Sequence, residues 1–239
     1  MPARPSLAAS LFALASVFGA LAWSQANVDG SDLWWHLAAG RVYAEAGEVV
    51  RSDPFSHTAR GHAWINHEWL WDRAAWSVYH AHEEWLAWGH LALIGATFAW
   101  VAVRARRRSG SWLATCASVW LAGAASDGFF DLRPQLVTLF AVAALLATLE
   151  WRRAPWLWPP LFALWANLHG GYLFGLGVLG LHAIDATESA FSDPAARSRA
   201  RRIWLGVLAA SAAAALNPWG VAIYALPFRR SRRPRRSGT

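Results

Sequence analysis

The chain is organised around the stretch from Asn27 to Asp72, which reads NVDGSDLWWHLAAGRVYAEAGEVVRSDPFSHTARGHAWINHEWLWD. Apolar segments flank it on both sides. The loop that contains it, from Gln25 to Glu84, holds nine of the chain's 15 acidic residues and six of its nine histidines, but only four arginines. The loop is therefore net negative in a chain whose net charge is +7. Partly desolvating ionisable side chains beside apolar segments costs free energy. This pattern therefore predicts that the loop has a functional role and is more than a connection.

Two helices are predicted inside this loop. The first covers residues 32–46: Ser31 can cap it, Asp32 lies in its first turn, and Gly47 can end it. The second covers about 66–82, with Asn66 as its cap and with Trp69 among aromatic residues that recur at helical spacing. Short helices rich in tryptophan, placed next to apolar segments, are expected to lie flat at the level of the lipid headgroups.

The composition is that of a polytopic membrane protein. Of the 239 residues 56% are hydrophobic and 18 are tryptophan, and the apolar residues come in blocks. All 22 basic residues are arginines, a bias that suggests a GC-rich bacterial genome. These arginines gather at the ends of apolar blocks, as in cytoplasmic loops, so nucleic acid is not an expected partner. The single cysteine, Cys116, excludes an internal disulfide and a cysteine-based metal site.

The apolar blocks predict an all-α bundle of about seven transmembrane spans. The predicted spans are residues 7–23, 85–103, 112–126, 135–149, two short arms within 156–186 that turn at 167–171, and 203–216. Arginines precede and follow the 156–186 region, so both of its ends should be cytoplasmic, which requires a hairpin. The expected location is the bacterial inner membrane, with loop 25–84 outside. A cleavable signal peptide is the alternative interpretation of residues 7–23.

The tail departs from this pattern. Six arginines lie between Arg229 and Arg236, on the side that the span count makes external. We therefore expect residues 1–228 to form the membrane part, and residues 229–239 to be a disordered or non-native tail on a chain that is truncated at its C-terminal end.

Three polar segments would meet at the outer face: loop 25–84, the turn from Asp127 to Arg133, and the turn at His169. Asp32 can act as a general base, with His67 and Glu68 as a second catalytic pair. The candidate ligands of a divalent cation such as Mg²⁺ or Mn²⁺ are Asp32, Asp127 and Asp131. The candidate substrate-binding residues are His36, Arg41, Arg133 and His169, and among these Arg133 can hold a phosphate.

Each of these candidates also has a purely structural interpretation. Asp32 would only cap its helix, Asp131 and Arg133 would form a local ion pair at a helix start, and His169 would satisfy backbone groups in a tight turn. The sequence leaves these alternatives open.

The segments SDLWWHLAAGR, RSDPFSHTARGHAWINHEWL, LRPQL and LWANLHGGYLFGLG resemble a group of bacterial polytopic proteins related to GT-C glycosyltransferases. The layout is similar to that of the catalytic subunit of oligosaccharyltransferase and of protein mannosyltransferases, over residues 5–228. The resemblance implies that an acid in the first external loop is the catalytic base or a metal contact. Asp32 occupies that place, with Asp29 as the competing choice, and Asp127 and Asp131 lie in the second external loop.

The resemblance implies an inverting transferase that takes a sugar from a polyprenyl-phosphate-linked donor at the external face of the membrane. Its expected partners are this lipid-linked donor and membrane lipids. The alternative is a non-catalytic polytopic protein or a truncated pseudoenzyme, in which the loop only structures the external surface. The two hypotheses differ in geometry, because an enzyme needs the acidic residues and histidines around one site.

Overall fold

The computed structural model describes residues 32–126, 129–149, 151 and 154–228. Within these ranges the regular structure is helical, apart from an isolated antiparallel bridge between Ser52 and Ala63. The prediction of an all-α chain is therefore confirmed. The predicted span 7–23 and the tail 229–239 lie outside the described residues, as do Ser31 and Asp127.

The loop contains the two predicted helices, α2 (Leu33–Ala46) and α3 (Trp69–Ala81). Gly47 ends α2 at a φ of 70°, in the left-handed conformation that glycine adopts without strain. The two helices pack closely at Gly40, where a Cβ atom would lie 2.0 Å from the backbone oxygen of Asp72. Helix α3 begins three residues later than expected because Asn66 lies in the turn before it, where its side chain accepts a hydrogen bond from the Glu68 N–H (3.1 Å).

Three apolar helices follow: α4 (Glu84–Ser109), α5 (Trp112–Ala125) and α6 (Gln135–Thr148). Helix α4 packs against both α5 and α6 around a buried apolar cluster that includes Ile94, Phe98 and Leu136. Among the described residues, α4 is the helix that is both long and apolar enough to cross a membrane, whereas α5 and α6 are apolar but have 14 residues each.

The predicted hairpin is present as α7 (Trp158–Leu168) and α8 (Tyr172–Ser192), joined by a short turn at His169. Gly175 lets α8 approach α7, since a Cβ there would lie 2.3 Å from the ring of Trp165. Helix α9 (Arg197–Ala214) packs on both arms and begins six residues before the predicted 203. Short 3-10 helices complete the chain, namely η3 (Ala154–Trp156), η4 (Pro194–Ala196) and η5 (Gly220–Phe228).

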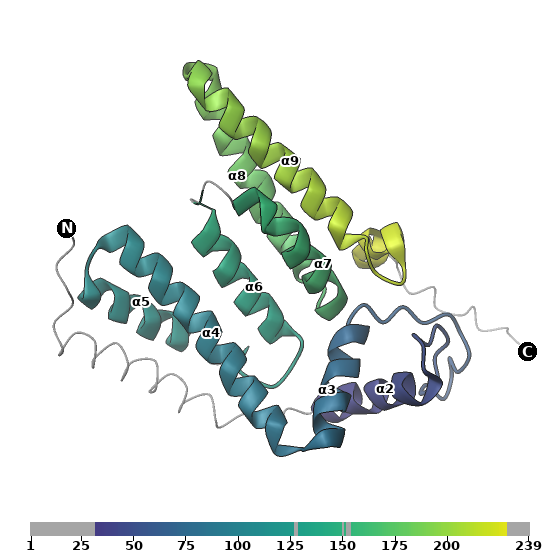
Figure 1. The fold of residues 1–239 in the computed structure, drawn as a ribbon. Coiled ribbons are helices and arrows are strands. Elements are labelled where there is room, and N and C mark those ends of the chain that lie inside the picture. Colours follow the sequence, from purple (N-terminus) through teal and green to yellow (C-terminus); the bar gives the residue numbers. More distant parts are fainter. Residues whose placement is uncertain (1–31, 127–128, 150, 152–153, 229–239) are drawn as a thin grey trace, which may run out of the picture.

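Helices α2 and α3 lie together at one end of the array formed by α4 to α9 (Figure 1). The start of α6 and the turn between α7 and α8 face this end, because Arg133 contacts Asp32 and His169 contacts Glu68. At the other end, Arg104 at the end of α4 donates a hydrogen bond to the backbone oxygen of Leu146. The fold thus brings the three predicted polar segments to one end of the molecule.

Candidate functional site

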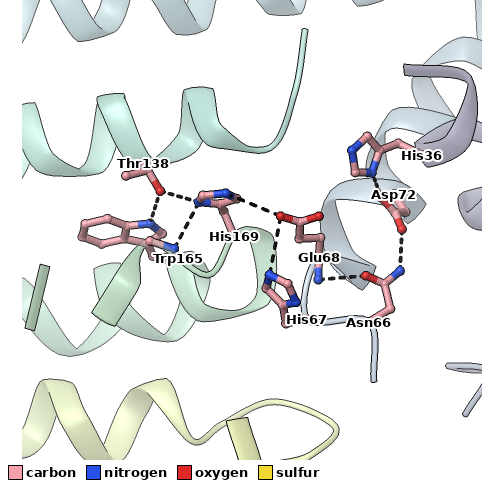
Figure 2. A network of polar contacts seen from close by, with 9 residues as sticks. His36, Asn66, His67, Glu68, Asp72, Thr138, Trp165 and His169 are labelled. Atoms are coloured by element: carbon pink, nitrogen blue, oxygen red, sulfur yellow. Dashed lines mark hydrogen bonds and ion pairs between the residues drawn. The ribbon is translucent and has the colours of Figure 1, made fainter. Parts of the chain in front are cut away.

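Glu68 is the centre of a polar cluster between the loop helices and the α6–α8 end of the bundle (Figure 2). It occupies the N-cap position of α3, and its side chain is 21% exposed. Its Oε1 atom lies 3.6 Å from His67 Nε2 and 3.5 Å from His169 Nε2. The predicted pair His67–Glu68 and the distant His169 are therefore neighbours around one carboxyl group.

The orientation of His169 follows from its hydrogen bonds. The Trp165 indole N–H donates to Thr138 Oγ1 (3.0 Å), so the Thr138 hydroxyl is left to donate to His169 Nδ1 (2.6 Å). The Gly171 N–H donates to the same ring nitrogen (3.1 Å). Because Nδ1 accepts twice, the proton of the neutral ring is assigned to Nε2, which faces Glu68.

A second set of contacts fixes the loop side of the cluster. Asp72, on α3, is fully buried, and its two carboxylate oxygens accept from His36 Nδ1 and from Asn66 Nδ2, each at 2.6 Å. The Asn66 amide also donates to the Tyr43 hydroxyl (2.9 Å). Since Asn66 accepts from the backbone of Glu68 as well, the Asp72 network holds the backbone beneath the Glu68 side chain.

The surroundings of Glu68 shift its proton affinity. Burial raises the pKa of Glu68 to about 7, and the nearby Asp72 and Asp32 carboxylates act in the same direction, against the effect of His36. Burial also lowers the pKa of His67, and it lowers the pKa of His169 to about 4, together with the neighbouring histidines. Near pH 7, Glu68 can therefore take up or release a proton while both histidines stay neutral.

Asp32 lies at the edge of this cluster and contacts Arg133. The structure places it at the N-cap of α2, not in the first turn, and its side chain makes no capping hydrogen bond. Its carboxylate, 54% exposed, lies 3.4 Å from Arg133 Nε, while Arg133 Nη2 lies 3.4 Å from Asp131 Oδ2. The purely capping interpretation of Asp32 is therefore wrong, and the local ion pair between Asp131 and Arg133 is present.

Two of the three predicted cation ligands, Asp32 and Asp131, lie on either side of the Arg133 guanidinium. The Arg133 guanidinium already contacts both Asp32 and Asp131, and a second positive charge between them would be repelled. In the described part of the chain, no three His, Cys, Asp or Glu side chains are grouped as a metal site requires. The third predicted ligand, Asp127, lies outside the described residues, so the predicted metal site stays a prediction.

Arg41 is not brought into the cluster. Its guanidinium donates to Glu45 (2.7 Å) one turn further along α2, and both side chains are more than 60% exposed. Five residues separate it from His36, which places the two side chains about 140° apart around the helix axis. Of the residues predicted from the sequence, Asp32, His36, His67, Glu68, Asp131, Arg133 and His169 do lie in or beside the cluster.

The sequence did not predict Asp72, Thr138 or Trp165 as members of the cluster. It predicted Asn66 only as a helix cap, and not as a residue that also binds Asp72 and Tyr43. Asp72 follows Glu68 by four residues, a spacing that puts two acids on one helix face and so offered a signal. Thr138 is one of two threonines in an apolar segment, and the residues around it carry no comparable signal.

An apolar cavity of about 310 Å³ adjoins the polar cluster at Thr138, which lines both. The cavity lies between α4, α5 and α6, and its walls include Phe98, Phe130, Leu139 and Phe174.

Comparison of the sequence with protein-family models and with curated proteins, and of the fold with solved structures, found no match.

Proposed function

We propose that this chain is a membrane glycosyltransferase of the GT-C-like kind, which transfers a sugar from a polyprenyl-phosphate-linked donor at the external face of the bacterial inner membrane. The observation that carries the proposal is the Glu68 carboxyl group, half-buried between two histidines and with a pKa near 7. A carboxylate with this proton affinity suits a general base that works at neutral pH.

The surface of the helices supports a multi-pass membrane location. Only 17% of the most apolar stretch of α4 is buried inside the protein, whereas a core helix of a soluble protein would be mostly buried. Large apolar side chains on the other helices are also exposed, among them Leu121, Phe174, Leu181 and Leu208. Apolar surface on so many helices fits contact with lipid.

In the proposed reaction, Glu68 takes the proton of an acceptor hydroxyl as the oxygen attacks the anomeric carbon of the donor sugar. The bond between this carbon and the phosphate oxygen breaks, and the polyprenyl phosphate departs with the bonding electrons. Arg133 offsets the charge on the departing phosphate, and the Nε2–H of His169 donates a hydrogen bond that orients the Glu68 carboxylate before it takes the proton. The apolar cavity beside Thr138 provides room for the first part of the prenyl chain.

The test compares three variants in a transfer assay with a short-chain prenyl-phosphate sugar as donor. Glu68→Gln is expected to lower turnover about 10²- to 10⁴-fold, because glutamine keeps the size but cannot accept a proton. Glu45→Gln is the matched control on α2, since its carboxylate contacts the exposed Arg41 outside the cluster. Wild-type turnover should rise as the pH rises through about 7, the pKa of the base.

Asp32→Asn separates the two candidate bases. If Glu68 is the base, this change weakens the contact with Arg133, reduces turnover and moves the pH profile slightly toward lower pH, because the Asp32 charge raises the pKa of Glu68. An inactive Asp32→Asn beside an active Glu68→Gln would return the base to Asp32, and full activity of both would refute the proposed site.

A further inference from the structure

A second cavity, of about 270 Å³, lies at the opposite end of the bundle from Glu68. It is formed where the end of α6 and the segment before α7 meet the start of α9. Its walls include Trp151, Trp158, Arg199 and Arg202, together with a few apolar side chains. The side chains of these two arginines and two tryptophans bring hydrogen-bond donors and positive charge to one small cavity, and none of the four carries an acceptor.

The two indoles have unused hydrogen-bond donors. The Nε1 atoms of Trp151 and Trp158 are both buried, and neither has a hydrogen-bond partner among the described residues. Trp158 as a whole is 1% exposed, so solvent does not satisfy its N–H group. A buried donor without an acceptor costs about 1–3 kcal/mol, so the packing around this cavity leaves part of its polar surface unsatisfied.

The arginines are placed where a helix disfavours them. Four of them, Arg197, Arg199, Arg201 and Arg202, lie in the first two turns of α9, at the positive end of its dipole. None forms an ion pair with a carboxylate among the described residues. Nearby, the guanidinium of Arg107 lies over the Trp151 ring, 4.7 Å from its centroid. A bound anion would neutralise this concentration of positive charge.

An apolar groove adjoins the cavity. Pro155 and Arg202 line both, and the groove continues along Trp156, Leu205 and Ala209. Trp156 and Leu205 are exposed, so this surface is accessible from the side of the bundle. Donors and cations beside an exposed apolar groove match a molecule with an anionic head and an aliphatic tail.

We propose that this cavity binds the phosphate group of an anionic phospholipid, with an acyl chain along the groove. Arg199 and Arg202, spaced three residues apart on one face of α9, hold the phosphate oxygens, while the Trp151 and Trp158 rings form part of the cavity wall. Basic pockets between helices at the cytoplasmic side of a membrane are a recurrent way to bind acidic headgroups. The proposal rests on the membrane location proposed above, but not on sugar transfer.

The test uses the full-length chain in detergent, with native mass spectrometry to count retained lipid after addition of phosphatidylglycerol or phosphatidylcholine. The cavity variant is Arg199→Gln/Arg202→Gln. The matched control, Arg197→Gln/Arg201→Gln, removes the same charge from the same turns but leaves the cavity residues intact. We expect the wild type to retain phosphatidylglycerol preferentially and the cavity variant to bind it about tenfold more weakly, with a much smaller effect in the control.

Equal losses in both double variants would overturn the site, because they would indicate diffuse attraction to charge. Equal retention of phosphatidylcholine and phosphatidylglycerol by the wild type would overturn it too. Displacement of the lipid by millimolar inorganic phosphate, but not by chloride, would overturn the lipid assignment in favour of a free phosphate in the same cavity. Size-exclusion profiles matching the wild type establish that each variant is folded, since the exchanged side chains are exposed.

Discussion

Two carboxyl groups one turn apart, Glu68 at the N-cap of α3 and Asp72 in its first turn, have very different surroundings. Asp72 is fully buried but accepts hydrogen bonds from His36 and Asn66, which satisfy both of its oxygens. Glu68 faces two histidines that burial keeps neutral, so its negative charge has no direct counter-ion there. The Asp72 arrangement stabilises the fold, whereas the Glu68 arrangement costs stability whenever the carboxyl group is ionised.

This difference predicts a pH-dependent effect of Glu68→Gln on stability. The folded pKa of Glu68, about 7, lies above its ordinary value of 4.5, so the folded state binds the proton more tightly than the unfolded state. The loss of folding stability caused by ionised Glu68 is therefore absent below pH 4.5. It grows as the pH rises and is complete above about pH 7. Removing the charge should stabilise the protein by up to about 3 kcal/mol at pH 8 and by almost nothing at pH 4.

Thermal unfolding in detergent at the two pH values measures this effect, with Glu45→Gln as the control. If Glu68→Gln were less stable than the wild type at pH 8, the ionised Glu68 side chain would be stabilising, and the prediction would be wrong.

The sequence identified Asp32 and the pair His67–Glu68 as candidates, but it did not rank them. The ranking depends on burial and on neighbours that are distant in sequence. Glu68 is partly shielded because the α7–α8 turn brings His169 against it, and Asp32 is left half-exposed beside Arg133. Neither contact has a signature in the local pattern, so residue types alone could not decide which carboxylate is the base.

Among the helices, α8 contains glycines that differ in how much space a side chain would have at their position. A Cβ at Gly175 would lie 2.3 Å from the Trp165 ring, whereas at Gly177, two residues on, nothing lies within 4 Å. Gly175→Ala is therefore expected to destabilise the protein by about 1–3 kcal/mol through overpacking. Gly177→Ala should be neutral or stabilising by up to about 1 kcal/mol, because alanine is the better helix former.

Chemical denaturation of the two alanine variants in the same detergent provides the comparison. A destabilisation of equal size at both positions would mean that helix propensity or lipid contact, and not the α7–α8 packing, controls the response of α8.

Helix positions could largely be predicted, because apolar blocks and end signals are local. Helix α5 ends one residue before the predicted limit and α6 also ends one residue early, and Gly47 ends α2 as expected. The starts of α3 and α9 were wrong for different reasons. Asn66 forms the turn before α3 instead of capping it, and the arginines before residue 203 continue the helix although they are polar.

At the scale of the whole molecule, charge is divided between two ends. The acidic loop and the histidines lie at one end, and arginines of α4 and α9 lie at the other. This division predicts that single cysteines at Thr58 and Ser109, in a Cys116→Ala background, react with an impermeant thiol reagent from opposite sides of the membrane. Both positions are exposed, so access within the protein does not limit the reaction. Reaction of both from the same side would refute the proposed orientation.

The unequal lengths of the helices have a consequence for the lipid around the molecule. With 26 residues α4 is about 39 Å long, whereas α5 and α6, with 14 residues each, are only about 21 Å long. A hydrocarbon layer of about 30 Å matches neither, so in the proposed location α4 would tilt strongly and the bilayer would thin beside α5 and α6. Deforming a bilayer costs energy that grows with its thickness, and the protein would accordingly prefer short-chain lipids and gather where the membrane is thinnest.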